Sequence, residues 1–204
     1  QIYVRGRKVD ESEWKRKKFK LIFLYIFLNR NSHLTKDSLL DYFYPEAEKE
    51  YSDNIFHQFL SNIRSILMVN SNDFSPEFVI YKNKCFEFNS NYIFTSDYNE
   101  FRKKMKRLNT NLKEQDLKSA LLEVIELSAE EFMKGSYESW VEDIREEIFT
   151  KRFKCMKRIS ELIHLESDMD KQFELYQILI RNEFNSFESY LDLIKLYINS
   201  GEIK

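Results

Sequence analysis

The chain has 204 residues, 43% of them apolar, and a formal net charge of −2 at pH 7. This length and apolar content suit one or two compact domains with real cores, and the near-neutral charge argues against broad, nonspecific binding of polyanions. With only three glycines and two prolines, the chain has few of the residues that favour tight turns, so we expect a mainly α-helical protein.

Cysteine usage and hydropathy indicate a cytoplasmic protein. Cys85 and Cys155 lie far apart and show no metal-ligand spacing, which is typical of a reduced compartment. The eight apolar residues at 21–28 are too few to cross a bilayer, and no small-residue cleavage site follows the basic residues at 15–20. We therefore expect neither a membrane span nor a secretion signal.

The first 30 residues predict two short strands and a helix. The strands, residues 2–4 and 8–9, flank a turn that uses the permissive backbone of Gly6. The chain starts abruptly, and we expect at least one strand or a whole module upstream. Basic residues crowd positions 15–20 before an apolar helix that runs to about Asn29. Positive charge at the start of a helix is unfavourable because it opposes the helix macrodipole, and phosphates of a nucleic-acid backbone are one candidate to compensate this charge. The alternative is a solvated lysine patch.

Residues 34–67 predict two consecutive helices. Thr35 provides the side-chain oxygen of an N-cap, apolar residues follow at helical spacing, and Pro45 ends the first helix. An acidic connector occupies residues 46–52. In the second helix, residues 53–67, apolar side chains recur at steps of three and four and share one buried face: Phe56, Leu60, Ile63 and Leu67.

The opposite face of the 53–67 helix carries amide, imidazole and hydroxyl groups almost without charge: Asn54, His57, Gln58, Ser61, Asn62 and Ser65. Such groups can read hydrogen-bond patterns on base edges in a major groove, and Asn or Gln can bind adenine through two hydrogen bonds. The pattern therefore favours a DNA-recognition helix. The alternative is an ordinary amphipathic helix whose polar face is only solvated.

A basic hairpin is predicted after this helix. Residues 70–76 are polar and irregular, and residues 78–88 alternate apolar and polar side chains on both sides of Lys82-Asn83. The hairpin tip would carry Lys82 and Lys84. Short helices followed by a basic hairpin are typical of a winged helix-turn-helix, an α+β fold whose wing reaches a neighbouring groove or phosphate. We predict this domain over residues 1–96.

From residue 97 the pattern is purely helical, with helices predicted over 97–108, 113–128, 139–164, 168–182 and 186–199 and a C-terminal cap at Gly201. Short loops indicate antiparallel helix pairs, so residues 97–204 predict an all-α array close to a repeat architecture. In the longest helix Arg152 is the only polar member of the apolar stripe. Residues 1–97 hold 14 basic and 13 acidic residues and the remainder 18 and 21, differences of +1 and −3 that give the net −2.

Several blocks of sequence occur in an order and spacing seen in a known family. They are Leu34 to Asp41, Tyr44-Pro45, Asn54 to Leu67 with its ending Ile63-Arg64-Ser65-Ile66-Leu67, Asp97 to Phe101, and Trp14. These blocks resemble the OmpR/PhoB-like winged helix of SARP-type bacterial transcription activators. Tyr44 stands where the family has Trp, and His57 and Asn62 stand at positions that are usually basic.

The second part of the chain is similar to the bacterial transcriptional activator domain of the same family, a TPR-like helical array. The matching residues are Phe132-Met133, Trp140-Val141, Arg145 and the run from Glu188 to Gly201, whereas residues 128–130 replace the family's Tyr-x-Gly. The likeness spans essentially the whole chain. It implies that the helical domain mediates homodimerisation or partner contact.

The resemblance also implies double-stranded DNA and RNA polymerase as partners. Asn54, His57, Gln58, Ser61 and Asn62 would face bases or nearby phosphates, Lys82 and Lys84 would anchor the wing, and Arg64 would contact the DNA backbone or brace the fold. A structural ion pair is the alternative for Arg64. RNA polymerase would contact the connector at Glu46, Glu48, Lys49 and Glu50, for which a plain solvated loop is the alternative.

Motifs for catalysis are absent from the sequence: no Gly-rich phosphate loop, His-Glu-x-x-His, Cys-x-x-Cys or nucleophile elbow occurs. Neighbouring carboxylates such as Glu146 and Glu147 point apart on a helix and cannot share a proton. We expect no enzyme, cofactor, metal or small-molecule site. The leading interpretation is a sequence-specific DNA-binding transcriptional regulator, and the alternative is a TPR-like protein-interaction module whose winged helix has weak or lost DNA affinity.

Overall fold

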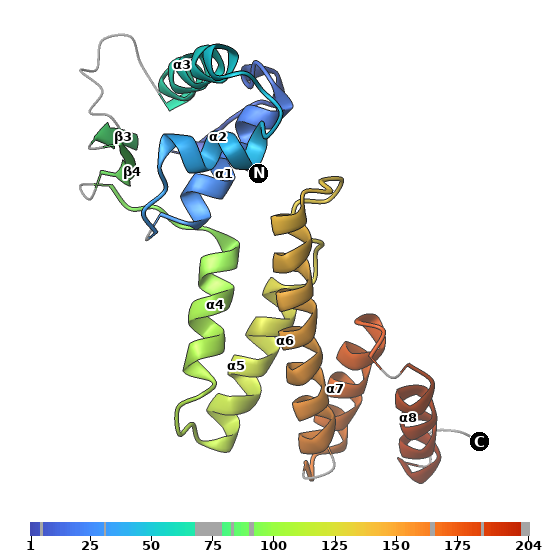
Figure 1. Ribbon diagram of the computed structural model, residues 1–204. Coiled ribbons are helices and arrows are strands. Elements are labelled where there is room, and N and C mark those ends of the chain that lie inside the picture. The colour runs from blue at the N-terminus through green and yellow to red at the C-terminus, as the bar shows by residue number, and fades with distance from the viewer. Residues whose placement is uncertain are drawn as a thin grey trace. The chain divides into compact units, whose positions relative to one another are not determined.

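The computed structural model describes the chain except for Arg5, Asn31, Asn83, Asn185 and residues 68–78, 90–91, 164–165 and 201–204 (Figure 1). Over the described residues it is mainly α-helical, with eight α-helices and two small two-stranded antiparallel sheets. Contacts divide the chain into two units, Gln1–Phe94 and Thr95–Lys204. The predicted irregular segment 70–76, positions 78 and 83 of the predicted wing, and the cap at Gly201 lie outside the described residues.

Unit 1 begins with a small sheet that holds the end of a later helix. Strands β1 (Tyr3–Val4) and β2 (Arg7–Lys8) pair antiparallel, and Gly6 between them has φ +81°, which a glycine adopts without strain. A 3₁₀ turn, η1 (Glu11–Glu13), follows. Arg7 pairs with Glu13 at 2.7 Å from Nη1 to Oε1, and its Nη2 donates to the carbonyl of Ile66 at 2.9 Å.

Helices α1 (Lys17–Leu28) and α2 (Lys36–Phe43) confirm the predicted apolar helix that runs to about Asn29 and the predicted short helix that stops at Pro45. The N-cap of α2 is Thr35, whose hydroxyl oxygen accepts from the Ser38 amide at 3.1 Å. The Ser38 hydroxyl in turn accepts from the Thr35 amide at 3.2 Å, so two amide groups at the helix start are satisfied. The helix ends before Pro45, because proline has no backbone N–H to continue the helical hydrogen bonds.

Helix α3 (Lys49–Leu67) starts four residues earlier than the predicted Asp53. The physical reason is Ser52, which is only 7% exposed and donates its hydroxyl to the carbonyl of Glu48 at 3.0 Å. The Ser52 amide also bonds to this carbonyl, at 2.9 Å. The acidic residues of the connector therefore sit at a helix N-terminus, where negative charge is stabilised by the helix dipole.

A hairpin follows α3, as predicted. Strands β3 (Val79–Lys82) and β4 (Cys85–Phe88) pair antiparallel with Lys82 opposite Cys85, which leaves a two-residue connection in which Lys84 has φ +63°. Strand β4 also attaches to the chain just before α2, because the amide of Phe86 donates to the carbonyl of Leu34 at 3.2 Å and Thr35 bridges to Cys85.

The core of unit 1 lies among α1, α2, α3 and the hairpin, and aromatic rings connect these elements. Phe19 of α1 meets Phe59 of α3 with ring centroids 5.6 Å apart. Phe56 of α3 meets Tyr81 at 5.1 Å and Phe86 at 5.8 Å, so α3 and the hairpin share one aromatic cluster. The buried apolar side chains fix which face of α3 points outward.

Unit 2 consists of α4 (Asp97–Arg107), α5 (Glu114–Leu127), α6 (Ser139–Ile163), α7 (Met169–Arg181) and α8 (Ser186–Ser200). Each helix packs against the next along the chain, which gives a sequential array (Figure 1). Every end of these five helices agrees with the predicted end to within one residue. Arg145 holds the turn before α6, because its Nε and Nη2 donate to the carbonyls of Phe132 and Met133 at 2.9 and 2.8 Å.

Helices α4 and α6 also contact each other directly, and they run parallel. Near the start of α4, the Tyr98 hydroxyl donates to Glu147 Oε2 at 2.5 Å. Further along, Met105 Sδ and Cys155 Sγ lie 3.8 Å apart. Contacts therefore advance in the same direction along both helices.

Arg152, the polar member of the apolar stripe on α6, is half-buried and donates from Nη2 to Asn182 Oδ1. None of the helices in the described part of the chain combines the length and apolar character of a membrane span.

Candidate nucleic-acid interface

One face of α3 is exposed and polar. Its buried side is wider than predicted, because it includes Ser52, Ile55, Phe59 and Ile66 besides Phe56 and Ile63, whereas Leu60 is only half-buried. This packing fixes the rotation of the helix. The residues that it turns to solvent are Asn54, His57, Gln58, Ser61, Arg64 and Ser65.

Asn62 is not part of this exposed face, and the prediction that places it there is wrong. The side chain is 2% exposed and bonds inside unit 1. Its Nδ2 donates to the carbonyl of Glu13 at 3.0 Å, and its Oδ1 accepts from the amide of Lys15 at 3.4 Å. Asn62 therefore holds the chain that enters α1 against the middle of α3.

This contact places basic residues beside the polar face. Lys15, Arg16 and Lys17 are exposed at the start of α1, and Arg16 Nη2 donates to Gln58 Oε1 at 3.2 Å. The Oε1 of Gln58 is therefore engaged by a cation, whereas its Nε2 donors still face solvent. In the sequence this basic run was a separate feature, and only the fold brings it to α3. The positive charge next to α3 comes from another helix.

The hairpin presents two further cations. Lys82, at the end of β3, and Lys84, in the connection to β4, are both exposed. They are tied to α3 through Tyr81, whose ring packs on Phe56 in the core. The polar face of α3, the start of α1 and the hairpin tip therefore belong to one unit with a shared core.

The connector between α2 and α3 is shorter than predicted. Glu46, Glu48, Lys49 and Glu50 are all exposed, but Lys49 and Glu50 lie in the first turn of α3, so only residues 44–48 connect the helices. Lys36 of α2 pairs with Asp53 of α3 at 2.7 Å from Nζ to Oδ1. This hydrogen bond lowers the pKa of the Asp53 carboxyl.

Arg64 is exposed in the last turn of α3. Positive charge is favourable there because the C-terminal end of a helix carries partial negative charge. The face of α3 offers amide, imidazole, hydroxyl and guanidinium groups, which form hydrogen bonds and ion pairs. Among the described residues no three His, Cys, Asp or Glu side chains are grouped to hold a metal ion.

Comparison with known proteins finds no matching family model, no matching curated protein and no matching solved structure.

Proposed function

We propose that the chain is a sequence-specific DNA-binding transcriptional regulator of the SARP type. In this proposal unit 1 is a winged helix-turn-helix in which α2 and α3 form the helix pair, α3 enters the major groove, and β3–β4 is the wing. Unit 2 is a TPR-like array. The observation that carries the proposal is the exposed, almost uncharged polar face of α3, with cations beside it at the start of α1 and further exposed cations on the hairpin of the same unit.

The exposed groups on α3 suit base recognition. The amides of Asn54 and Gln58 can donate and accept at once, which is the pattern that the major-groove edge of adenine requires. His57 and Ser61 lie on the same face and add hydrogen-bonding groups of different reach. None of these four side chains is buried, so base contact requires no unfolding of the helix.

The neighbouring cations suit phosphate contact. Lys15, Arg16 and Lys17 lie beside α3, and Lys82 and Lys84 lie on the hairpin. Ion pairs with phosphates release counterions, so they supply affinity that falls as salt rises, whereas base contacts supply sequence preference. The near-neutral total charge of the chain is compatible with local phosphate contacts by these exposed cations.

Two further partners belong to the same proposal. RNA polymerase would contact the exposed end of the connector and the first turn of α3 at Glu46, Glu48, Lys49 and Glu50. The helical unit would contact a second copy of the chain or another protein.

The proposal is tested by selecting duplexes from a random 20-base-pair pool with the full chain and measuring binding by fluorescence anisotropy. We expect one enriched motif, with affinity that falls at least tenfold between 50 and 200 mM salt, roughly as a few phosphate contacts require. Gln58→Ala should reduce the preference for the enriched duplex over a shuffled one. Gln115→Ala, the same change on the exposed surface of α5, is the matched control and should have no effect. Absence of any enriched motif would overturn the proposal.

The second candidate is a protein-interaction module without useful DNA affinity. The observation that favours it is an exposed apolar stripe along α8, formed by Phe187, Tyr190, Leu191, Ile194 and Ile198. If the α8 helices of two copies pair antiparallel about a two-fold axis between residues 192 and 193, Phe187 lies opposite Ile198 and Leu191 lies opposite Ile194. In this pairing the stripe is self-complementary. Sedimentation of the wild type and of Leu191→Asp tests this. A monomeric wild type at 100 μM, together with an enriched duplex, would reject it.

A further inference from the structure

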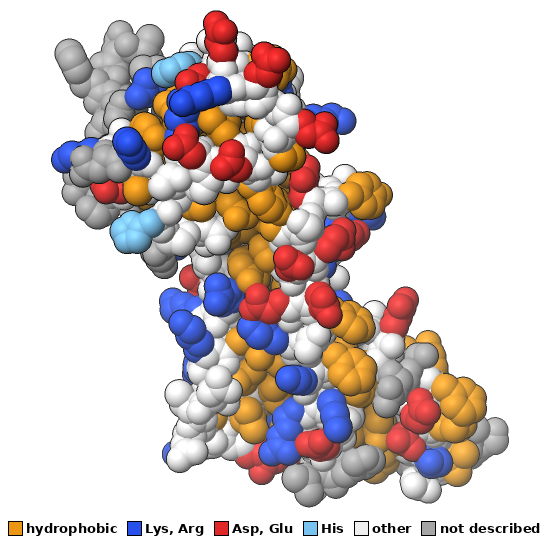
Figure 2. Space-filling model, viewed as in Figure 1, with side chains coloured by type: hydrophobic (Ala, Val, Ile, Leu, Met, Phe, Trp, Pro, Cys, Tyr) orange, Lys and Arg blue, Asp and Glu red, His pale blue; other side chains and the backbone are white. Residues whose placement is uncertain are grey.

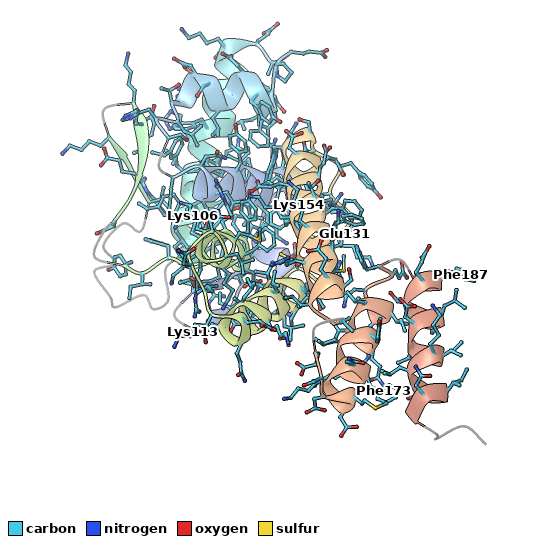
Figure 3. All side chains as sticks on the ribbon, turned by 90° about the horizontal axis from the view of Figure 1, so that it is seen from below. Lys106, Lys113, Glu131, Lys154, Phe173 and Phe187 are labelled. Carbon is cyan, nitrogen blue, oxygen red and sulfur yellow. The ribbon has the colours of Figure 1, made fainter. Side chains whose placement is uncertain are left out.

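The parallel contact of α4 and α6 brings basic residues of both helices to one surface. Met105 and Cys155 point at each other, and successive residues of a helix are turned by about 100°. Since the helices are parallel, the residue after Met105 and the residue before Cys155 turn to the same side. These two residues are Lys106 and Lys154, both exposed and both labelled in Figure 3.

More cations lie on this side, and we call the group the α4–α6 basic face: Lys103, Lys106, Lys151, Lys154, Lys157 and Arg158. Figure 2 shows Lys and Arg side chains gathered over the second halves of α4 and α6. Lys103, Lys151 and Arg158 each pair with a carboxylate of their own helix: Glu100, Glu147 and Glu161. Lys106, Lys154 and Lys157 form no ion pair with any described residue. Their three positive charges are therefore uncompensated by a salt bridge in the described part of the chain.

Exposed aromatic rings border the α4–α6 basic face on α6. Phe149 is 66% exposed and Phe153 is 42% exposed, and their ring centroids are 6.4 Å apart. Phe153 also packs on Phe184 at 4.9 Å, which holds its ring in place. Because Lys157 is four residues after Phe153 and lies beside it on the surface of α6, a ligand at the basic face can also cover apolar surface there.

The basic face is short, and acidic residues limit it. Asp143 and Glu146 are exposed on the first half of α6, on the side that carries Lys154 and Lys157 further along. A long polyanion such as a nucleic acid that followed α6 would meet these carboxylates. A short acidic segment that ends at the basic half would not. Charge and apolar surface together therefore favour a short peptide over a nucleic acid.

We infer that the α4–α6 basic face binds a short acidic segment of another protein that also carries bulky apolar residues. The carboxylates of this segment pair with Lys106, Lys154 and Lys157, and its apolar side chains cover Phe149 and Phe153. The inference concerns a surface of unit 2 and is independent of DNA binding by unit 1.

The test uses the full chain and a fluorescein-labelled 14-residue peptide of Asp, Glu, Leu and Phe, measured by anisotropy. Two control peptides separate the contributions: one with Asn and Gln in place of the acidic residues, and one with Ser in place of the apolar residues. We expect the first peptide to bind most tightly, and its affinity to fall with salt because the charged groups are exposed.

The decisive variant is Lys106→Gln with Lys154→Gln and Lys157→Gln. Its matched control, Lys113→Gln with Lys134→Gln and Lys171→Gln, makes the same charge change at exposed lysines elsewhere in unit 2. We expect the first variant to weaken peptide binding roughly tenfold or more, as a few exposed ion pairs allow, and the control variant to have little effect. If the triple variant is unfolded by circular dichroism, Lys154→Gln alone is measured and should weaken binding about threefold. Equal affinities for the variants, or displacement of the peptide by an oligothymidylate of the same net charge at the same concentration, would overturn the inference.

Discussion

The side-chain amide of Asn62 donates a hydrogen bond to the main-chain carbonyl of Glu13, with 3.0 Å between Nδ2 and O. The two residues are 49 positions apart, and one belongs to the buried side of α3 while the other ends the 3₁₀ turn before α1. An amide on a helix that was expected to read DNA thus joins two elements of the core. Its neighbour Ser61 is exposed, so adjacent positions have different roles.

Replacement of Asn62 should therefore destabilise unit 1. Asn62→Ala removes the hydrogen bond and leaves the Glu13 carbonyl without this buried partner, which costs about 1 to 3 kcal/mol. Ser61→Ala is the matched control and should change the free energy of unfolding by less than about 0.5 kcal/mol. Urea unfolding followed by circular dichroism measures both. Equal effects of the two substitutions would contradict the burial of Asn62.

Phe56 should contribute more to stability than any single polar residue of α3. Its ring is 3% exposed and contacts both Tyr81 and Phe86 of the hairpin. Phe56→Ala leaves a cavity between α3 and the hairpin, and we expect a loss of about 3 to 5 kcal/mol. Tyr51→Ala, which truncates an exposed aromatic residue of the same helix, should cost far less. Comparable losses in the two variants would show that the aromatic cluster does not hold the hairpin.

Glu147 should make unit 2 sensitive to acid. Burial acts to raise the pKa of its carboxyl, but the hydrogen bonds from Lys151 and Tyr98 outweigh burial and lower it below the ordinary 4.5. A lowered folded-state pKa means that the stabilisation is complete above about pH 4.5 and is lost as the pH falls through the folded-state value. Glu147→Gln should therefore reduce the free energy of unfolding by about 1 kcal/mol at pH 7 and have a smaller effect at pH 3.

The control for this pH dependence is Glu146→Gln, which neutralises the exposed neighbouring carboxyl. It should change stability little at either pH. Urea unfolding at pH 7 and pH 3 gives the four comparisons. A Glu147→Gln effect of the same size at both pH values would contradict the proposed hydrogen bonds to the ionised carboxylate.

The two cysteines should differ in reactivity. Cys155 is 2% exposed, and burial raises the pKa of its thiol to about 11, so its thiolate is scarce at pH 8. Cys85 is half-buried in β4. Under native conditions iodoacetamide should modify Cys85 at least ten times faster than Cys155, as followed by peptide mass spectrometry. In 8 M urea the two rates should converge, and persistence of the difference there would reject burial as its cause.

The helices of unit 2 could be predicted closely because their apolar residues keep one period over many turns. Helix α3 shows where this reasoning stops. The stripe Phe56, Leu60, Ile63 and Leu67 fits a helix, but Ile55, Phe59 and Ile66 widen the buried face and include Asn62 within it. Ile55, Phe59 and Ile66 lie seven, three and four residues from position 62, and this helical spacing was the signal in the sequence that could have identified Asn62 as buried.

Other features of the site depend on contacts between distant segments. Arg16 and Gln58 are 42 positions apart, so a sequence pattern cannot pair them. The early start of α3 depends on the buried hydroxyl of Ser52, which a polarity pattern assigns to solvent. Local periodicity therefore predicts the elements, whereas the neighbours of the polar face follow only from tertiary packing.

The β-bridge between the backbones of Thr35 and Cys85 has a consequence for the folding of the chain during its synthesis. Strand β4 reaches the ribosome exit only after both α2 and α3 have been made, so the newly made helices wait for their last core partner. At bacterial or eukaryotic elongation rates, roughly 5 to 20 residues per second, the synthesis of the chain from Thr35 to Cys85 takes about 3 to 10 s. During it the phenylalanines that later meet the hairpin are open to chaperones, and a stop codon placed just before β4 should yield an aggregation-prone product.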